Sequence, residues 1–202
     1  MRYLIVCLFV IAACQSKKNT QEEKAQPAAD TTVKADTTST NSPLSSRELT
    51  TSTGKIVVVR ETHPMGMSMS DVAVFFKDDS STVLSLKDKD PVSDVVLADL
   101  DKNGFDEVYV ITAAAGSGSY AGVHGFYSNK DLSFSFVHMP DITEKDLAAG
   151  GMYEGYEGHD KIKIEGDKLV RNFPVKSDKN PSRSIAYTIK KTEGGFVFSP
   201  AK

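Results

Sequence analysis

The sequence is short of cysteine, and this shortage excludes several kinds of stabilisation and chemistry. Only two cysteines occur among 202 residues, and the first, Cys7, lies in a segment that we expect to be removed. The mature chain then has no disulfide, no cysteine-based zinc site and no thiolate nucleophile. Its folded part must be held together by its core alone.

The chain also lacks an excess of basic charge. From residue 49 onward, 18 Lys and Arg stand against 22 Asp and Glu, and the two signs are interspersed. Binding of nucleic acid requires a basic stripe or patch. We therefore expect no nucleic-acid partner, whereas a basic protein partner is compatible with this charge.

The apolar run near the amino terminus is too short to span a bilayer. It extends from Leu4 to Ala12 after a positive start at Arg2, and a spanning helix needs about 20 residues. Small residues then lead to Cys14, a pattern typical of a secretory signal peptide that resembles the lipobox of bacterial lipoproteins. The resemblance implies cleavage before Cys14 and attachment of acyl chains such as palmitate there. An ordinary secretory signal is the alternative.

The stretch after Cys14 is rich in Lys, Thr, Ser, Gln, Ala, Asp and Pro and has almost no large apolar side chains. Such a composition cannot bury enough surface to offset the entropy of ordering. We expect a signal peptide at 1–13, a lipidated cysteine with a disordered tether at 14–48, and one domain at 49–202. Gln15 and Ser16 stand directly after Cys14, with no aspartate retention signal beside the cysteine. By resemblance to bacterial sorting rules, this favours the outer membrane, facing the periplasm or the cell surface.

Short alternating apolar segments predict an all-β domain. Leu132, Phe134 and Phe136 alternate with other residues as in a half-buried strand, and turn residues recur at intervals of about 8–12 residues, as in a sandwich or barrel. One short helix is expected at 141–149, with Asp141 and Glu144 at capping-box spacing. The expected strands are 55–61, 70–77, 82–86, 95–98, 107–115, 121–127, 132–138, 161–165, 168–175, 184–190 and 196–198.

A loop of small and polar residues, 116–120, follows the strongest strand signal in the chain. Its glycines allow backbone shapes that other residues resist, and Tyr120 offers a large contact area with a polar tip. The loop and Ala121 also match the dinucleotide-binding pattern G-x-G-x-x-G/A, but that site requires a helix to begin there. Residues 122–127 are instead typical of strands and turns. We interpret 116–120 as a recognition loop.

Oxygen-bearing side chains are regularly spaced just before this strand. Asp99, Asp101, Asn103 and Glu107 occupy positions one, three, five and nine of a loop with Gly104 at position six, as in calcium loops. An EF-hand needs a glutamate at position twelve and flanking helices, and neither is present. A single calcium-binding turn stays open. The alternative, which the Asn-Gly pair favours, is a tight turn without metal.

Histidine and serine, which often act in catalysis, are present, but their positions in the sequence match no catalytic motif. The histidines, at 63, 124, 138 and 159, are not paired at metal-ligand spacing. Ser117 and Ser119 do not lie in a G-x-S-x-G motif, and the sequence places no base beside them. We expect no enzymatic activity and no cofactor other than the calcium of the open alternative.

Two stretches together resemble the periplasmic inhibitors of invertebrate-type (i-type) lysozyme. The first is LADLDKNGFDEVYV at 97–110, which runs into GSGSY at 116–120; the second is YEGHD at 156–160, followed by LVRNFP at 169–174. The likeness covers about residues 94–190. It implies an antiparallel β-sandwich or flattened barrel of about eight strands.

The resemblance also implies a mechanism for the loop Ser117-Gly118-Ser119-Tyr120. In that family the corresponding loop enters the active-site cleft of the lysozyme, and the hydroxyls of Ser117 and Tyr120 would bond the catalytic carboxyls. The expected partner is thus a lysozyme of i-type, met by a domain anchored to a membrane through its lipid. The alternatives are a structural or adhesive envelope lipoprotein that binds another protein or glycan, and a calcium-dependent binding module.

Overall fold

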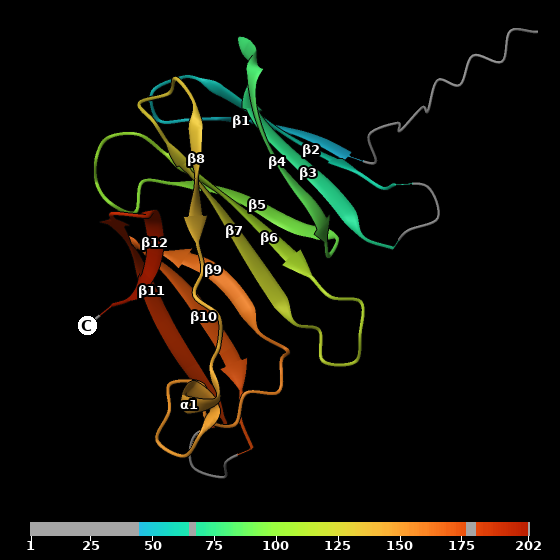
Figure 1. Ribbon diagram of the computed structural model, residues 1–202, viewed down its shortest axis with the longest axis vertical. Helices are drawn as coiled ribbons and strands as arrows, with labels where there is room; N and C mark the ends of the chain where they lie inside the picture. Colours follow the sequence, from blue (N-terminus) through green and yellow to red (C-terminus); the bar gives the residue numbers. More distant parts are fainter. Residues whose placement is uncertain (1–44, 65–67, 177–180, 202) are drawn as a thin grey trace, which may run out of the picture. The chain divides into compact units, whose positions relative to one another are not determined.

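The computed structural model describes residues 45–64, 68–176 and 181–201. In these ranges twelve strands form two sheets, with one short helix (Figure 1). The elements are β1 Ser45–Thr50, β2 Ile56–Thr62, β3 Ser70–Phe76, β4 Asp79–Lys89, β5 Val92–Ala98, β6 Glu107–Ala113, β7 Ala121–Ser128, β8 Phe134–His138, α1 Glu144–Leu147, β9 Lys161–Glu165, β10 Lys168–Pro174, β11 Ser182–Thr192 and β12 Gly195–Pro200.

The first sheet has the order β1-β2-β3-β4, and the second has the order β5-β6-β7-β8-β12-β11-β10-β9. The all-β prediction is confirmed. The described residues form twelve strands, more than the about eight that the resemblance implies, and eight of them form the second sheet. The expected strands 55–61, 70–77 and 82–86 correspond to β2, β3 and β4 of the first sheet. Not every pair is antiparallel, because β8 and β12 run parallel, with Val137 opposite Phe196.

Strand β6 separates two apolar clusters, which explains why it gives the strongest strand signal. Val108 and Val110 pack on one side with residues of the first sheet, such as Phe76. Tyr109 packs on the other side with residues of β10 and β12, such as Phe198. A strand buried on both faces reads as a continuous apolar run. Each such side chain contributes roughly 1.5–3 kcal/mol when fully buried.

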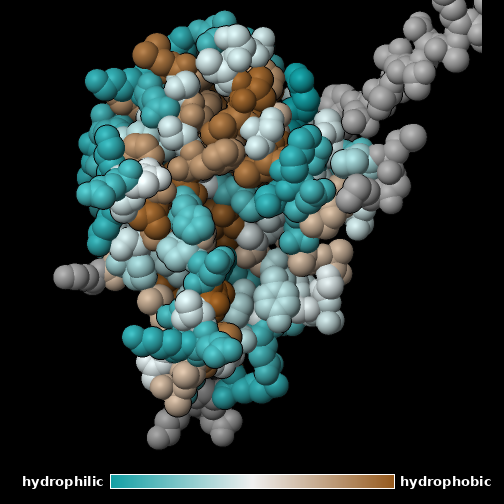
Figure 2. All heavy atoms as spheres, viewed as in Figure 1, coloured by the Kyte–Doolittle hydropathy of each residue, from teal (hydrophilic) through white to brown (hydrophobic). Residues whose placement is uncertain are grey.

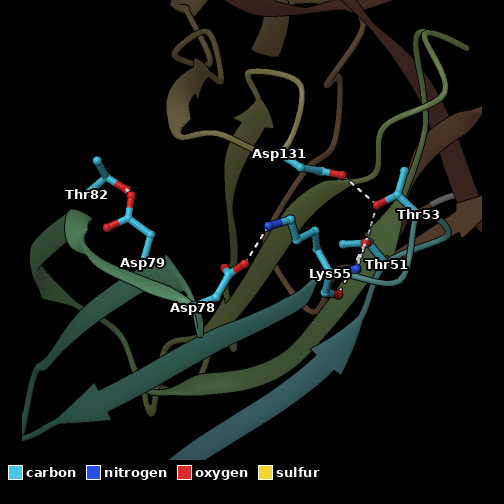
Figure 3. A network of polar contacts seen from close by, with 7 residues as sticks. All are labelled: Thr51, Thr53, Lys55, Asp78, Asp79, Thr82 and Asp131. Carbon is cyan, nitrogen blue, oxygen red and sulfur yellow. Dashed lines mark hydrogen bonds and ion pairs between the residues drawn. The ribbon is translucent and has the colours of Figure 1, made fainter.

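The two sheets are also joined by polar contacts at one end (Figure 3). Thr53, in the turn between β1 and β2, donates to Asp131 Oδ2 over 2.5 Å, and Asp131 lies in the turn between β7 and β8. Lys55 Nζ pairs with Asp78 Oδ2 at 2.5 Å on the first sheet.

On the face drawn in Figure 2, apolar side chains lie among hydrophilic ones.

The first strand begins earlier than expected. Strand β1 starts at Ser45, four residues before the boundary at 49 and inside the stretch expected to be tether. It pairs with β2 along its whole length, from Ser45 opposite Glu61 to Thr50 opposite Ile56. Among the residues of β1, only Leu49 packs against an apolar cluster, the one that contains Phe76 and Val108. Backbone pairing with β2 therefore forms this edge strand, although its sequence has no alternation of apolar and polar residues that would predict a strand.

The helix uses a different cap from the one expected. Thr143 is the N-cap of α1, and Asp146 completes the capping box. Asp146 N donates to Thr143 Oγ1 over 3.3 Å, and Thr143 N donates to Asp146 Oδ2 over 2.9 Å. Thr143 and Asp146 have the same spacing in the sequence as Asp141 and Glu144. The structure selects Thr143 as the N-cap because both hydrogen bonds of its capping box form.

None of the described helices combines the length and apolar character needed to cross a membrane. Cys14, the expected signal peptide and residues 14–44 of the expected tether lie outside the described residues.

Candidate functional site

The 116–120 loop joins β6 to β7 and closes as a tight turn. Ala114 N donates to Tyr120 O over 2.9 Å, and Ser119 N donates to Gly116 O over 3.0 Å. Ser119 has a φ of 41°, a conformation that few residues other than glycine adopt. The turn carries the side chains of Ser117 and Tyr120 to the surface, where Tyr120 is 50% exposed.

Gly118 lets the ring of Tyr120 lie over the loop backbone. A Cβ atom at position 118 would lie 2.3 Å from Tyr120 Cε2, far inside van der Waals contact. A larger residue would therefore push the ring away. The ring is held on its own loop, although half of its surface remains exposed.

A second loop, 156–160, braces the first. His159 N donates to Gly118 O over 2.6 Å. The backbones approach so closely that a Cβ atom at Gly158 would lie 2.1 Å from Gly118 O, and Gly158 has a φ of +89°. Only glycine satisfies both conditions. The two stretches that resemble one family in sequence thus contact each other in the fold.

A series of aromatic rings connects Tyr120 to the core. The Tyr120 and Tyr156 centroids lie 5.8 Å apart, edge to face, and Tyr156 meets Phe173 at 4.9 Å. Phe173 belongs to the buried cluster of the second sheet. Burial, followed by the charge of Asp160, raises the pKa of the Tyr156 hydroxyl above its ordinary value. The exposed tyrosine therefore stands on a packed aromatic support.

A buried ion pair holds the chain directly after the loop. Asp160 Oδ1 accepts from Ala121 N over 2.9 Å, and Arg171 Nη2 donates to Ala121 O over 2.9 Å. Arg171 Nε and Asp160 Oδ2 lie 3.1 Å apart but make no aligned hydrogen bond within the described ranges. Their attraction is one of charge. Both peptide groups that flank the first residue of β7 are thereby fixed.

His63, one of the four histidines, comes together with Ser70, a serine that the sequence did not single out, but not as a catalytic relay. His63 Nε2 lies 2.8 Å from Ser70 Oγ, and Ser70 donates to Glu61 Oε1 over 2.6 Å. The carboxylate thus bonds the serine and not the second ring nitrogen of His63. Ser70 is 0% exposed, so no substrate reaches its hydroxyl.

The spaced acidic residues do converge at the turn between β5 and β6. Carboxylate oxygens of Asp99, Asp101 and Glu107 all lie within 4.8 Å of one another. Burial, with a smaller contribution from Asp101, raises the pKa of Glu107 to about 8. Asn103, the fourth candidate, donates through Nδ2 to Tyr127 Oη over 2.9 Å. This turn lies at the opposite end of β6 from the 116–120 loop.

No family model matches this chain. No curated protein matches it either. Among solved structures, it is similar to the crystal structure of PliI-Ah, a periplasmic lysozyme inhibitor of I-type lysozyme from Aeromonas hydrophyla. The identity is 24%, the TM-score is 0.36, and the match covers 46% of this chain and 85% of that one.

Sequence reasoning identified both loops but missed how they are held. The roles of Asp160 and Arg171 depend on contacts with Ala121, 39 and 50 residues away. One signal was available: Arg171 is a charged residue inside the buried stretch of β10, next to Val170. A charge in such a place is rarely tolerated without a partner.

Proposed function

We propose that this protein inhibits a lysozyme of i-type by inserting the 116–120 loop into the active-site cleft of that enzyme. The observation that carries the proposal is the state of Tyr120. Its side chain is 50% exposed, while its ring rests on Gly118 and against Tyr156. An aromatic residue that is exposed and yet fixed has the properties of a binding anchor.

The chemistry of the loop suits a glycosidase cleft. Such enzymes use two carboxyl groups on either side of the bond that is cut, one of them protonated. A hydroxyl both donates and accepts hydrogen bonds, so Ser117 and Tyr120 can satisfy either carboxyl. A loop of glycine and serine is also narrow enough to enter a cleft shaped for a polysaccharide. Bonded in this way, the carboxyls are closed to sugar and water.

The bracing of the loop supports tight binding. Ordering a flexible loop on association costs affinity, and this cost falls when the bound conformation already exists in the free protein. Here His159, Asp160 and Arg171 fix the backbone on both sides of Tyr120. The loop therefore loses little conformational freedom when it binds.

The proposal includes an envelope location. Lipidation at Cys14 would hold the domain at a membrane through several acyl chains, which bind far more firmly than one. The residues up to 44 would then let the domain reach a lysozyme that enters the envelope. The residues directly after Cys14 are Gln15 and Ser16 and not aspartate, which by resemblance to bacterial sorting rules favours attachment to the outer membrane.

The function is tested by measuring inhibition of i-type, c-type and g-type lysozymes by the chain and by Tyr120→Ala. We expect inhibition of the i-type enzyme and a loss of roughly 30-fold or more in the variant, as for an interface hot spot. Leu132→Ala is the matched control, because Leu132 is an exposed side chain in the turn at the other end of β7. Equal inhibition by Tyr120→Ala and the control would refute the role of the loop. Absence of inhibition of all three enzymes would refute the function.

A further inference from the structure

The turn between β5 and β6 contains a carboxylate that the fold leaves without a sufficient partner. Glu107 is 0% exposed. Its Oε2 atom accepts from Leu100 N at 3.0 Å and from Tyr109 Oη at 3.1 Å. Its Oε1 atom is buried and has no hydrogen-bond partner among the residues that the structure describes. A buried polar atom in this state is costly unless something else satisfies it.

Within the described part of the chain, no basic side chain pairs with the carboxyl group of Glu107. Lys102 is the basic residue of this turn, but its Nζ lies 2.6 Å from Asp167 Oδ2 and its side chain is largely exposed. The two donors to Glu107 are a backbone amide and a tyrosine hydroxyl, both neutral. Asp99 and Asp101 add further negative charge at the same place.

The geometry of the three carboxylates fits one bound cation. Their oxygens lie within 4.8 Å of one another. Calcium–oxygen distances are about 2.3–2.6 Å, so two ligands of the same ion lie at most about 5 Å apart. All the candidate ligands are oxygens, and calcium prefers oxygen ligands in flexible arrangements, whereas zinc prefers nitrogen and sulfur.

We propose that the carboxylates of Asp99, Asp101 and Glu107 bind one calcium ion at the turn between β5 and β6. Asn103 stands beside them and is held by its bond to Tyr127 Oη. The ion gives the buried carboxyl group of Glu107 a partner and offsets the repulsion among the three carboxylates. It joins the end of β5 to the start of β6, the strand that separates the two apolar clusters. The site is independent of the 116–120 loop and of the proposed inhibition.

The test uses the full chain, freed of metal with a chelator and then supplied with calcium chloride. We expect Tm to rise by roughly 5–10 °C when calcium exceeds its dissociation constant about a hundredfold. Terbium, which replaces calcium, gives a second signal. Tyr109 contacts Glu107, and the chain has no tryptophan, so bound terbium should emit when tyrosine is excited. Calcium should displace it.

Asp101→Asn is the informative variant, because Asp101 is exposed and its replacement does not disturb the core. Loss of one charged ligand should weaken calcium binding roughly tenfold or more. Asp167→Asn is the matched control, since it removes a carboxylate that pairs with Lys102 of the same turn but is not a ligand. It should bind calcium as the unmodified chain does. The proposal is overturned by an absent Tm shift and terbium signal, by equal binding in Asp101→Asn, or by an equal response to magnesium at the same concentration.

Discussion

Arg171 Nε lies 3.1 Å from Asp160 Oδ2, and both side chains also bond the backbone of Ala121, the residue after Tyr120. Both side chains are almost fully buried. Removing one partner of such a pair leaves an uncompensated charge in a region of low dielectric. The exposed loop therefore depends on a pair of charges that lies beneath it.

Replacement of Arg171 by Met should destabilise the protein strongly. The expected decrease in the free energy of unfolding is about 3–5 kcal/mol, because Asp160 is left buried and unpaired. Urea denaturation measures it. Lys163→Met is the control, since Lys163 pairs with Glu165 on the exposed surface, where such pairs contribute about 1 kcal/mol or less. If Arg171→Met lowers the free energy of unfolding no more than Lys163→Met does, the buried pair contributes no more to stability than the exposed one.

Gly158→Ala should separate the two loops. The added methyl group meets Gly118 O at 2.1 Å and the backbone has a φ of +89°, so backbone strain and steric overlap both act. Gly166→Ala is a matched control, because Gly166 has a φ of +60° with no atom within 4 Å of the added group. The control should lose about 1 kcal/mol of stability from strain alone, and Gly158→Ala should lose more.

The same two variants separate stability from inhibition. Inhibition of lysozyme should weaken in Gly158→Ala, because the 116–120 loop is no longer held from the side, and should be unchanged in Gly166→Ala. Enzyme assays with both proteins below their melting temperatures measure this. If the two glycine variants inhibit equally well, the 156–160 loop does not preorganise the binding loop.

His124 should make stability depend on pH in a defined range. Burial, followed by the charge of Lys89, lowers its pKa from 6.5 to about 4. Between these values the unfolded chain binds a proton that the folded chain does not, so stability falls as pH falls from 6.5 towards 4 and this contribution levels off below 4. Its upper limit is about 3 kcal/mol, at about 1.4 kcal/mol for each pKa unit.

His124→Gln removes this contribution. The loss of stability between pH 7 and pH 4, measured by urea denaturation, should be smaller in the variant than in the unmodified chain. His138→Gln is the control, because His138 is exposed at the end of β8. A pH profile for His124→Gln that coincides with that of the unmodified chain would contradict the assignment.

Cys14 should carry the lipid. In a bacterial host supplied with labelled palmitate, we expect the unmodified chain to incorporate label and to separate with the membrane fraction. Cys14→Ser should do neither, because its hydroxyl cannot replace the thiol. Cys7→Ser is the control and should behave as the unmodified chain. Labelling of Cys14→Ser would contradict the expected lipobox.

The features that could be predicted from the sequence are those that depend on residues close together in the chain. Residues 107–113 form a strand because their apolar run is buried on both faces, and the spaced carboxylates converge because they lie in one turn. Strand β1 escaped prediction because Ser45, Ser46 and Arg47 carry no apolar alternation, and its pairing with β2 forms only in the folded sheet.

Long-range contacts are the part that the sequence could not supply. Asp160 and Arg171 act together on Ala121, and nothing local indicates that these three residues meet. The cap of α1 shows a different limit. Two residue pairs share the capping spacing, and only the closed bonds between Thr143 and Asp146 decide between them.

The kinetics of i-type lysozyme in the presence of this protein test the account most directly. A loop that occupies the active-site cleft competes with polysaccharide, so the apparent KM should rise with inhibitor concentration while kcat stays constant. Tyr120→Ala, with an unchanged Tm, should raise KM far less at the same concentration. A fall in kcat at constant KM, or an undiminished effect of Tyr120→Ala, would contradict the account.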